Sequence, residues 1–379
     1  MKSQAYKEKM RSFVKSEKLK GLFSSESSFK KNILRLTSRN VTVGMDPGSW
    51  SVKVVRSANA TAPFDVKVCV LKTRAFDGVE ESVKKTLLHE GVYEAKAAFA
   101  LADEKTECHD FNLPKLGKKE LETAIDWEIK KAIASAEYVY HDVLTHETDT
   151  GVNVQCIVAA KDIVKSRYQE GALFGVKPSF LETESSALMA CVAAMRPKTP
   201  LDKIVIWDLG YSAFRFIFID KGRVVFTRSL YFGLATLCHQ VASQLGVLPQ
   251  EVQESLVKLP SEVGPESSGE LTGGENTMSP VLSVLERSFQ ELLYTLCEEF
   301  RRSEFYVREQ KNIEPAEEIL LCGGGACLPF TIQYLQKHLT EKKMGILNPF
   351  EMAKSLPKGI EVSSGPLWAC ALGLSLRNA

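Results

Sequence analysis

An aspartate at the end of an apolar strand, followed by glycine and small polar residues, occurs twice in this chain. The first copy lies in residues 41–56 and contains Asp46, and the second lies in residues 204–219 and contains Asp208. An aspartate in this position can hold a hydrated cation, and the glycine and serine residues after it expose backbone N–H groups that can bind phosphate. Together with a glycine turn at residues 323–326, the two copies predict two similar halves that face one nucleotide cleft.

Strands and helices are predicted around these motifs in alternation, as in an α/β fold. Each motif is a strand, a turn and a second strand, and residues 214–219 and 223–229 are predicted to pair through a hairpin turn. The pattern of apolar residues predicts a helix over residues 118–134 and a long helix over residues 281–307. Residues 260–280 are rich in Ser, Gly, Pro and Glu, which predicts a surface loop.

The composition is that of an ordinary globular protein of two or more domains, with 379 residues, 44% hydrophobic and 25% charged. A net charge of +1 gives no reason to expect nucleic-acid binding, although residues 1–39 carry eleven Lys or Arg against three Glu. We expect this basic extension to be flexible, with peripheral membrane contact as the alternative. The nine cysteines have no zinc-site spacing, and no apolar run is long enough to span a bilayer, so a cytoplasmic protein is predicted.

The order of the three glycine-containing motifs resembles that of the actin, sugar-kinase and Hsp70 superfamily. More narrowly, residues 41–378 resemble the PilM family, which acts in type IV pilus assembly and motility. The segments that carry this narrower resemblance are Leu113-Pro114-x-Leu116, Glu120-Leu121-Glu122-x-Ala124-Ile125-x-Trp127-Glu128, Val158-Ala-Ala-Lys161, Glu182-Thr-Glu184-Ser-Ser-Ala187-Leu188, Asn348-Pro349-Phe350 and the C-terminal stretch from Gly365-Pro366.

The resemblance implies an α/β, actin-like (ribonuclease H-like) two-lobed fold with duplicated mixed β-sheets flanked by helices. It also implies an inserted subdomain like that of the cell-division protein FtsA. The expected division is residues 1–39 as the extension, 40–94 with 181–200 and 357–379 as subdomain IA, 95–180 as the insert, 201–240 with 316–356 as subdomain IIA, and 241–315 as subdomain IIB.

The resemblance further implies ATP and magnesium as cofactors, and at most a weak ATPase activity with no assigned catalytic residue. The residues expected to bind the nucleotide are Asp46, Gly48, Ser49, Trp50, Ser51, Lys53, Asp208, Gly210, Tyr211, Ser212, Gln253, Gly323, Gly324 and Gly325. Asp46 and Asp208 would hold the magnesium through water, and Lys53 would supply a point charge to the phosphates.

Several of these positions depart from the family pattern on the nucleotide side. Pro47 lacks an N–H and stiffens the first turn, and Trp50 stands where a small residue is usual. Tyr211 replaces a small residue, Phe214 replaces a threonine, and Gln253 lies where the family carries a charged residue. These departures together predict that ATP binding is weakened or lost.

The family role implies a scaffold that binds the cytoplasmic tail of a PilN-like inner-membrane protein, in contact with other pilus assembly proteins and motor ATPases. The protein would then lie at the inner face of the inner membrane through its partners. The residues expected to line the partner groove are Leu113, Leu116, Ile125, Trp127 and Ile129. Apolar residues at this spacing are equally typical of a helix core.

Three alternatives stay open from the sequence. A sugar or acetate kinase of the same superfamily would need intact phosphate loops, against which Trp50 and Tyr211 argue. An FtsA-like protein would be tethered to the membrane, for which the basic extension is the available segment. A relative of the type II secretion protein GspL would continue into a membrane span.

Overall fold

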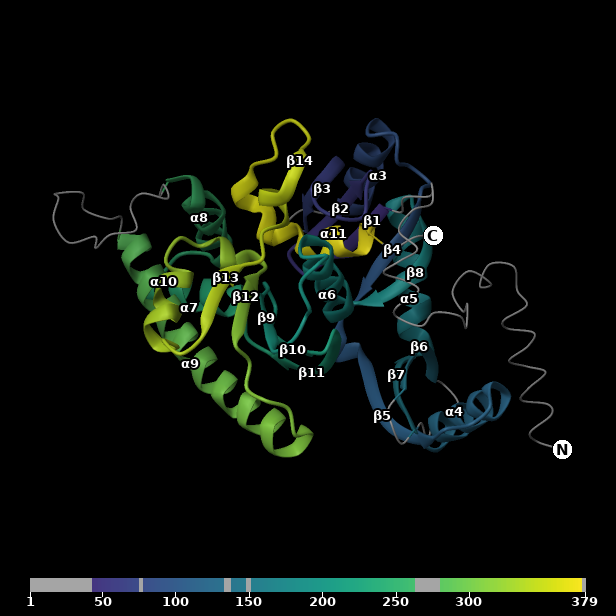
Figure 1. Cartoon of the computed structure of the whole chain (residues 1–379). Helices are drawn as coiled ribbons and strands as arrows, with labels where there is room; N and C mark the ends of the chain where they lie inside the picture. Colours follow the sequence, from purple (N-terminus) through teal and green to yellow (C-terminus); the bar gives the residue numbers. More distant parts are fainter. Residues whose placement is uncertain (1–42, 75–77, 133–137, 148–150, 263–279, 377–379) are drawn as a thin grey trace.

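Two mixed β-sheets with matching strand orders form the two lobes of the computed structural model (Figure 1). The structure describes residues 43–74, 78–132, 138–147, 151–262 and 280–376. The predicted basic extension at residues 1–39 and most of the predicted loop at residues 260–280 lie outside the described residues.

The sheet of the first lobe has the order β14-β3-β2-β1-β4-β8. Its strands are β1 (Val43–Pro47), β2 (Ser51–Ser57), β3 (Phe64–Thr73), β4 (Lys96–Leu101), β8 (Lys177–Thr183) and β14 (Ala353–Ser355). The sheet of the second lobe has the order β11-β10-β9-β12-β13. Its strands are β9 (Ile204–Leu209), β10 (Phe214–Asp220), β11 (Arg223–Leu230), β12 (Glu318–Cys322) and β13 (Lys343–Ile346).

The two sheets repeat one topology once the short strand β14 is set aside. In each, a central strand pairs antiparallel with the next strand of the chain and parallel with a later strand: β1 with β2 and β4, and β9 with β10 and β12. The predicted duplication of mixed sheets in an α/β fold is therefore confirmed.

Two helices, α6 (Glu184–Met195) and α11 (Ala369–Ser375), lie between the sheets and join the lobes (Figure 1). One apolar core contains residues of both helices together with Val55 of β2 and Ile206 of β9. The approach is close at Gly44 on β1, where a Cβ atom would lie 2.0 Å from the Ala371 carbonyl oxygen of α11. Only glycine permits this packing of helix on strand.

The remaining helices cover the outer faces of the sheets. α3 (Val79–His89) and α5 (Lys161–Phe174) pack on the first sheet, whereas α7 (Leu234–Leu245), α8 (Pro249–Glu262), α9 (Pro280–Lys311) and α10 (Thr331–His338) surround the second. Short 3₁₀ segments connect them: η1 (Asp103–Lys105), η2 (Gly324–Cys327), η3 (Pro349–Met352) and η4 (Val362–Trp368). The long helix predicted over residues 281–307 is confirmed as α9.

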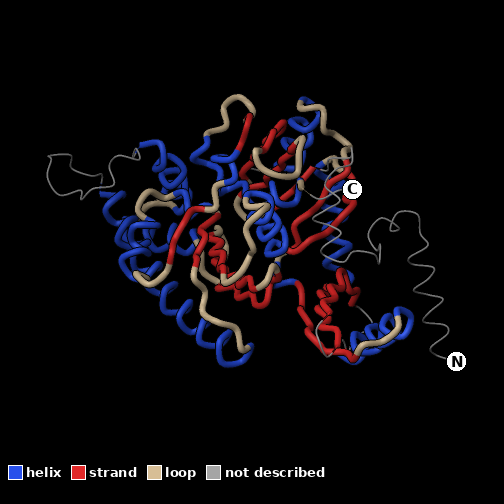
Figure 2. Tube along the Cα trace, viewed as in Figure 1, coloured by secondary structure: helices blue, strands red, loops and turns tan. Residues whose placement is uncertain are grey.

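A third, three-stranded sheet forms a separate module beside the first lobe, as Figure 2 shows. It consists of β5 (Thr106–Pro114), β6 (Tyr138–Glu147) and β7 (Gly151–Ala160), and it carries helix α4 (Lys118–Ala132) on one face. The module also touches the second lobe, because the Gln155 side chain donates a hydrogen bond of 3.0 Å to the Val224 carbonyl oxygen. Among the described residues, no helix has the length and apolar character that crossing a membrane requires.

Candidate functional site

A cavity of about 590 Å³ opens between the lobes, where the two aspartate-containing hairpin turns meet the glycine turn. Thirteen of the fourteen residues predicted to bind nucleotide line it, and the exception is Gly325, which is buried against Leu209. Segments far apart in the sequence are thus brought together at one site. The volume lies within the range typical of small-molecule sites.

The two hairpins share a cross-strand ion pair that has the same spacing in both lobes. On β1 and β2, Asp46 pairs with Lys53 in the register, and the Lys53 ammonium lies 2.6 Å from the Asp46 carboxylate. On β9 and β10, Asp208 pairs with Arg215, and the guanidinium lies 3.1 Å from the carboxylate. In each hairpin the cation follows the aspartate by seven residues. Sequence reasoning assigned a role to Lys53 and missed Arg215, although this repeated spacing was the signal that could have found it.

Arg215 is the buried centre of a cluster of charges that spans both lobes. The residue is 5% exposed and faces four carboxylates. Apart from Asp208 of its own lobe, these belong to the first lobe: Glu184 at 2.6 Å, Glu104 at 3.2 Å and Asp103 at 3.8 Å. The carboxylate of Asp103 is in turn held by the backbone N–H and hydroxyl of Ser185 at the start of α6. The cluster therefore fixes the relative position of the lobes.

Burial has the largest effect on the pKa values of Glu184, Asp208 and Asp103, and the Arg215 guanidinium has the second largest. Burial raises the pKa of Glu184 to about 7, although Arg215 acts in the opposite direction. Burial also raises the pKa of Asp208 and of Asp103, again against the effect of Arg215. The pKa of Arg215 itself stays well above its usual value because the carboxylates outweigh the cost of burial. With one cation among four carboxylates, Glu184 is therefore partly protonated at neutral pH.

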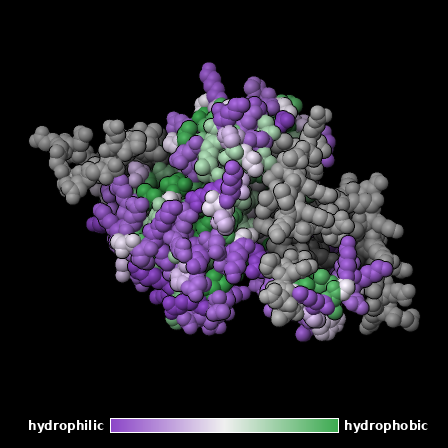
Figure 3. All heavy atoms as spheres, viewed as in Figure 1, coloured by the Kyte–Doolittle hydropathy of each residue, from purple (hydrophilic) through white to green (hydrophobic). Residues whose placement is uncertain are grey.

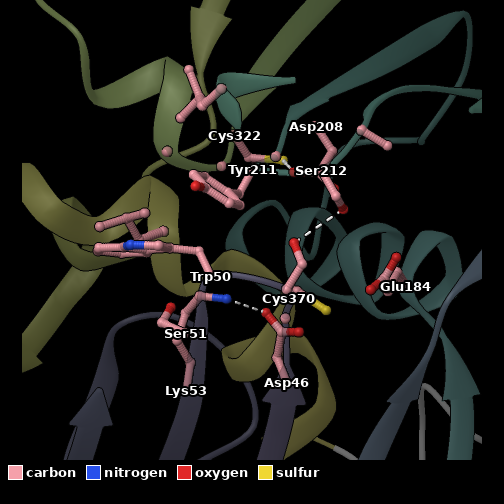
Figure 4. A pocket seen from close by; sticks show the side chains of 18 of the residues that line it. Asp46, Trp50, Ser51, Lys53, Glu184, Asp208, Tyr211, Ser212, Cys322 and Cys370 are labelled. Atoms are coloured by element: carbon pink, nitrogen blue, oxygen red, sulfur yellow. Dashed lines mark hydrogen bonds and ion pairs between the residues drawn. The ribbon is translucent and has the colours of Figure 1, made fainter. Parts of the chain in front are cut away.

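Bulky side chains from the two turns line the cavity. Figure 4 shows Trp50 of the first lobe and Tyr211 of the second on facing sides of it. The Tyr211 hydroxyl lies 3.4 Å from the side-chain oxygen of Gln253 on α8. The two turns also touch directly, because the Ser49 hydroxyl donates a hydrogen bond of 3.0 Å to the Ser212 hydroxyl. The lobes are therefore in contact at the Ser49–Ser212 hydrogen bond as well as at Arg215.

The glycine turn approaches the second aspartate closely. Gly323 has a φ of +81°, and a Cβ atom there would lie 2.7 Å from the Asp208 carboxylate. A positive φ and this lack of space both require glycine. The predicted turn at residues 323–326 is thus a wall of the cavity built around Asp208.

The five residues predicted to line a partner groove are divided by the structure. Ile125 and Ile129 are buried in the small core between α4 and its sheet, and Leu113 packs at its edge. Leu116 is half-buried, whereas Trp127 is 60% exposed on the outer side of α4. The helix turns the two isoleucines toward the sheet because they are four residues apart. Trp127 lines a shallow surface groove, together with Lys119, Glu120, Thr123 and Ala124.

Two lobes with duplicated sheets, two helices between them and a cavity at the paired hairpin turns define a protein of the actin-like fold. The chain belongs to the family of the type IV pilus assembly protein PilM, whose sequence profile matches residues 44–379. The family resemblance found in the sequence is confirmed. No curated protein sequence matches the chain.

Solved structures with a similar fold include the PilM–PilN type IV pilus biogenesis complex, with a TM-score of 0.71 and 20% sequence identity over 89% of this chain and 98% of that chain. The ethanolamine utilization protein EutJ from Carboxydothermus hydrogenoformans matches with a TM-score of 0.48 and 13% identity, over 90% of this chain and 92% of that chain. MreB5 of Spiroplasma citri bound to AMPPNP matches with a TM-score of 0.42 and 13% identity, over 88% and 94%.

Proposed function

We propose that this protein is a scaffold of type IV pilus assembly that binds the cytoplasmic tail of a PilN-like inner-membrane protein. Its family supports the pilus role, and the similar structure of a PilM–PilN complex supports the class of partner. The protein would then lie at the inner face of the inner membrane through that partner. We place the binding site on the module formed by β5, α4, β6 and β7, which lies within the segment 95–180 predicted to be the inserted subdomain.

The outer face of α4 is the observation that favours this module. The five groove residues, at positions 119, 120, 123, 124 and 127, recur at the spacing of one helix face. The opposite face buries Ile125 and Ile129, so the groove face is not needed for the module's own core. Figure 3 shows mostly hydrophilic side chains where α4 lies in Figure 1, with a small hydrophobic patch among them, and Ala124 is the one groove residue that is hydrophobic on the scale of that figure. Trp127 offers an aromatic anchor of the kind that dominates peptide-binding energy.

Replacing Trp127 with alanine should weaken binding of the tail about ten-fold or more, because the change removes a large anchor without touching the core. The measurement is fluorescence anisotropy of a labelled synthetic peptide that carries the cytoplasmic tail of the cognate PilN-like protein. Phe305→Ala is a matched control, since Phe305 is also 60% exposed and also has a cation near its ring, Arg308 at 5.4 Å. Lys131 stands 5.1 Å from the Trp127 ring. Equal losses in both variants, or unchanged binding by Trp127→Ala, would refute this site.

We further infer that nucleotide binding at the interlobe cavity is weakened. Support comes from Trp50 and Tyr211 on facing sides of the cavity and from the hydrogen bond between the two turns. Moreover, Lys53 is held by Asp46 at 2.6 Å and is less free to meet a phosphate group. The cavity still has room for a small molecule.

The double change Trp50→Ser with Tyr211→Gly should tighten ATP binding about ten-fold or more, because it removes bulk from both turns and leaves the charged residues in place. Calorimetric titration of ATP, with and without magnesium, into nucleotide-free protein measures the effect. The control is Trp368→Phe, which changes an aromatic residue buried outside the cavity lining. Stoichiometric binding to the unmodified chain with a low-micromolar Kd would show that the bulky side chains do not obstruct the site.

A further inference from the structure

Both aspartates of the duplicated motif already have a protein cation as partner. Lys53 lies 2.6 Å from Asp46, and Arg215 lies 3.1 Å from Asp208. The pKa of Lys53 is raised because Asp46 outweighs the opposing effect of burial. Each hairpin therefore carries its own neutralising charge at the strand end.

Arg215 does more than neutralise its own hairpin. Its guanidinium reaches Glu184 and Glu104 of the other lobe while it contacts Asp208. A planar guanidinium with five N–H donors can serve several carboxylates at once. Gathering carboxylates from two domains around one positive charge is also what a bound divalent cation does.

The residues of the cavity do not fit a divalent cation of their own. Five cationic side chains line it against four acidic ones: Lys53, Arg74, Lys105, Arg167 and Arg215 against Asp46, Glu104, Glu184 and Asp208. Within the described ranges, no three His, Cys, Asp or Glu side chains are arranged to hold a metal ion. A hydrated cation near Asp208 would also meet the repulsion of Arg215. The sequence-based prediction that Asp46 and Asp208 hold magnesium is therefore not favoured by this arrangement.

We propose that Arg215 is the built-in cation of the interlobe cavity, so that the lobes are held together by a protein guanidinium and the site binds no divalent metal. The cavity is then suited to an anionic ligand that comes without a metal ion. This proposal stands apart from the partner site on α4. It also does not depend on how tightly ATP binds, because it concerns the metal alone.

Binding of Mn²⁺, measured by the electron paramagnetic resonance signal of the free ion, tests this proposal on the full chain without nucleotide. The Asp208→Asn variant is the reference for Mn²⁺ that is bound by surface carboxylates outside the cavity. Unmodified protein should bind no more Mn²⁺ than this variant. Arg215→Ala should gain one Mn²⁺ per chain, because it leaves the carboxylates of both lobes without their cation. The added change Asp208→Asn should remove that gain.

Two results would overturn the proposal. One is an unmodified chain that binds one more Mn²⁺ than Asp208→Asn, and the other is a folded Arg215→Ala variant that gains none. Should Arg215→Ala fail to fold, the thermal midpoint of the unmodified chain decides, because a ligand that binds the native state raises it. We expect the same midpoint in excess Mg²⁺ as in chelator, and a rise of several degrees in Mg²⁺ would contradict a metal-free site.

Discussion

The change Arg215→Ala should lower the free energy of unfolding by about 3–5 kcal/mol, because it leaves buried carboxylates without their partner. The residue is 5% exposed, and it faces Glu184, Asp208 and two further acidic groups within 4 Å. Asp103 is buried with Arg215, and the side chains of Glu184 and Asp208 are only 17% and 22% exposed, so water screens these charges less than it does at the surface. Since whole domains are commonly stable by only about 5–15 kcal/mol, the loss should be visible in any unfolding curve.

Urea denaturation followed by circular dichroism measures this effect, and two variants serve as controls. Arg228→Ala removes an arginine that pairs with Glu299 and whose side chain is 35% exposed, so we expect a loss of about 1 kcal/mol or less. Adding Glu184→Gln to Arg215→Ala should change the loss little at neutral pH, because Arg215 lowers the pKa of Glu184 and its removal leaves that carboxyl protonated. Equal losses from Arg215→Ala and Arg228→Ala would mean that the cluster contributes no more than a surface pair.

Much of the architecture could be predicted from the sequence because the duplicated hairpin is a local pattern. Asp46 and Asp208 end apolar strands, and the glycine residues after them mark the turns, so both motifs were found from composition and order alone. Their convergence on one cavity was predicted from the duplication itself, because two similar halves were expected to face one nucleotide cleft. The strand pairing behind this cavity could not be read from local pattern, because β9 and β12 are neighbours in one sheet although more than a hundred residues separate them, and β1 belongs to the other sheet.

The charged cluster was missed because its members come from four separate elements, one of which is the strand β9 that contains Asp208. Asp103 and Glu104 lie in a 3₁₀ turn, Glu184 begins a helix, and Arg215 lies in a strand that is otherwise apolar. Arginine in a buried strand is rare unless it is paired, and this could have marked Arg215 as unusual. Its partners depend on how the lobes pack, which no local pattern encodes.

The partner groove was predicted from hydrophobicity, and this criterion did not separate its exposed residues from the core of the module. Apolar residues on α4 were grouped by type, but a helix sends Ile125 and Trp127 to different faces. The groove residues that accompany Trp127 are mostly polar or small, so hydrophobicity could not select them. The groove therefore remains a prediction, with Trp127 as its best-supported member.

The change Trp207→Ala should lower the free energy of unfolding by about 3–5 kcal/mol, because it empties the centre of the second lobe's core. Trp207 is fully buried on β9, and its ring centroid lies 5.0 Å from that of Phe216 and 5.1 Å from that of Phe300. Trp207→Phe is the matched control. Among the described residues the indole N–H has no hydrogen-bond partner, so phenylalanine forfeits only volume. Urea denaturation should show less than half the loss for Trp207→Phe, and equal losses would mean that the indole group matters beyond its size.

Trp207 also precedes Asp208 directly, which links the core of the second lobe to the charged cluster. A cavity under β9 would let the strand move, and the distance between Asp208 and Arg215 depends on the pairing of β9 with β10. The double variant should therefore lose less unfolding free energy than the sum of the losses from Trp207→Ala and Arg215→Ala. Trp207→Ala already weakens the Asp208–Arg215 ion pair that Arg215→Ala removes. A double variant whose loss equals the sum of the single losses would show that aromatic packing and the interlobe charges stabilise the protein independently.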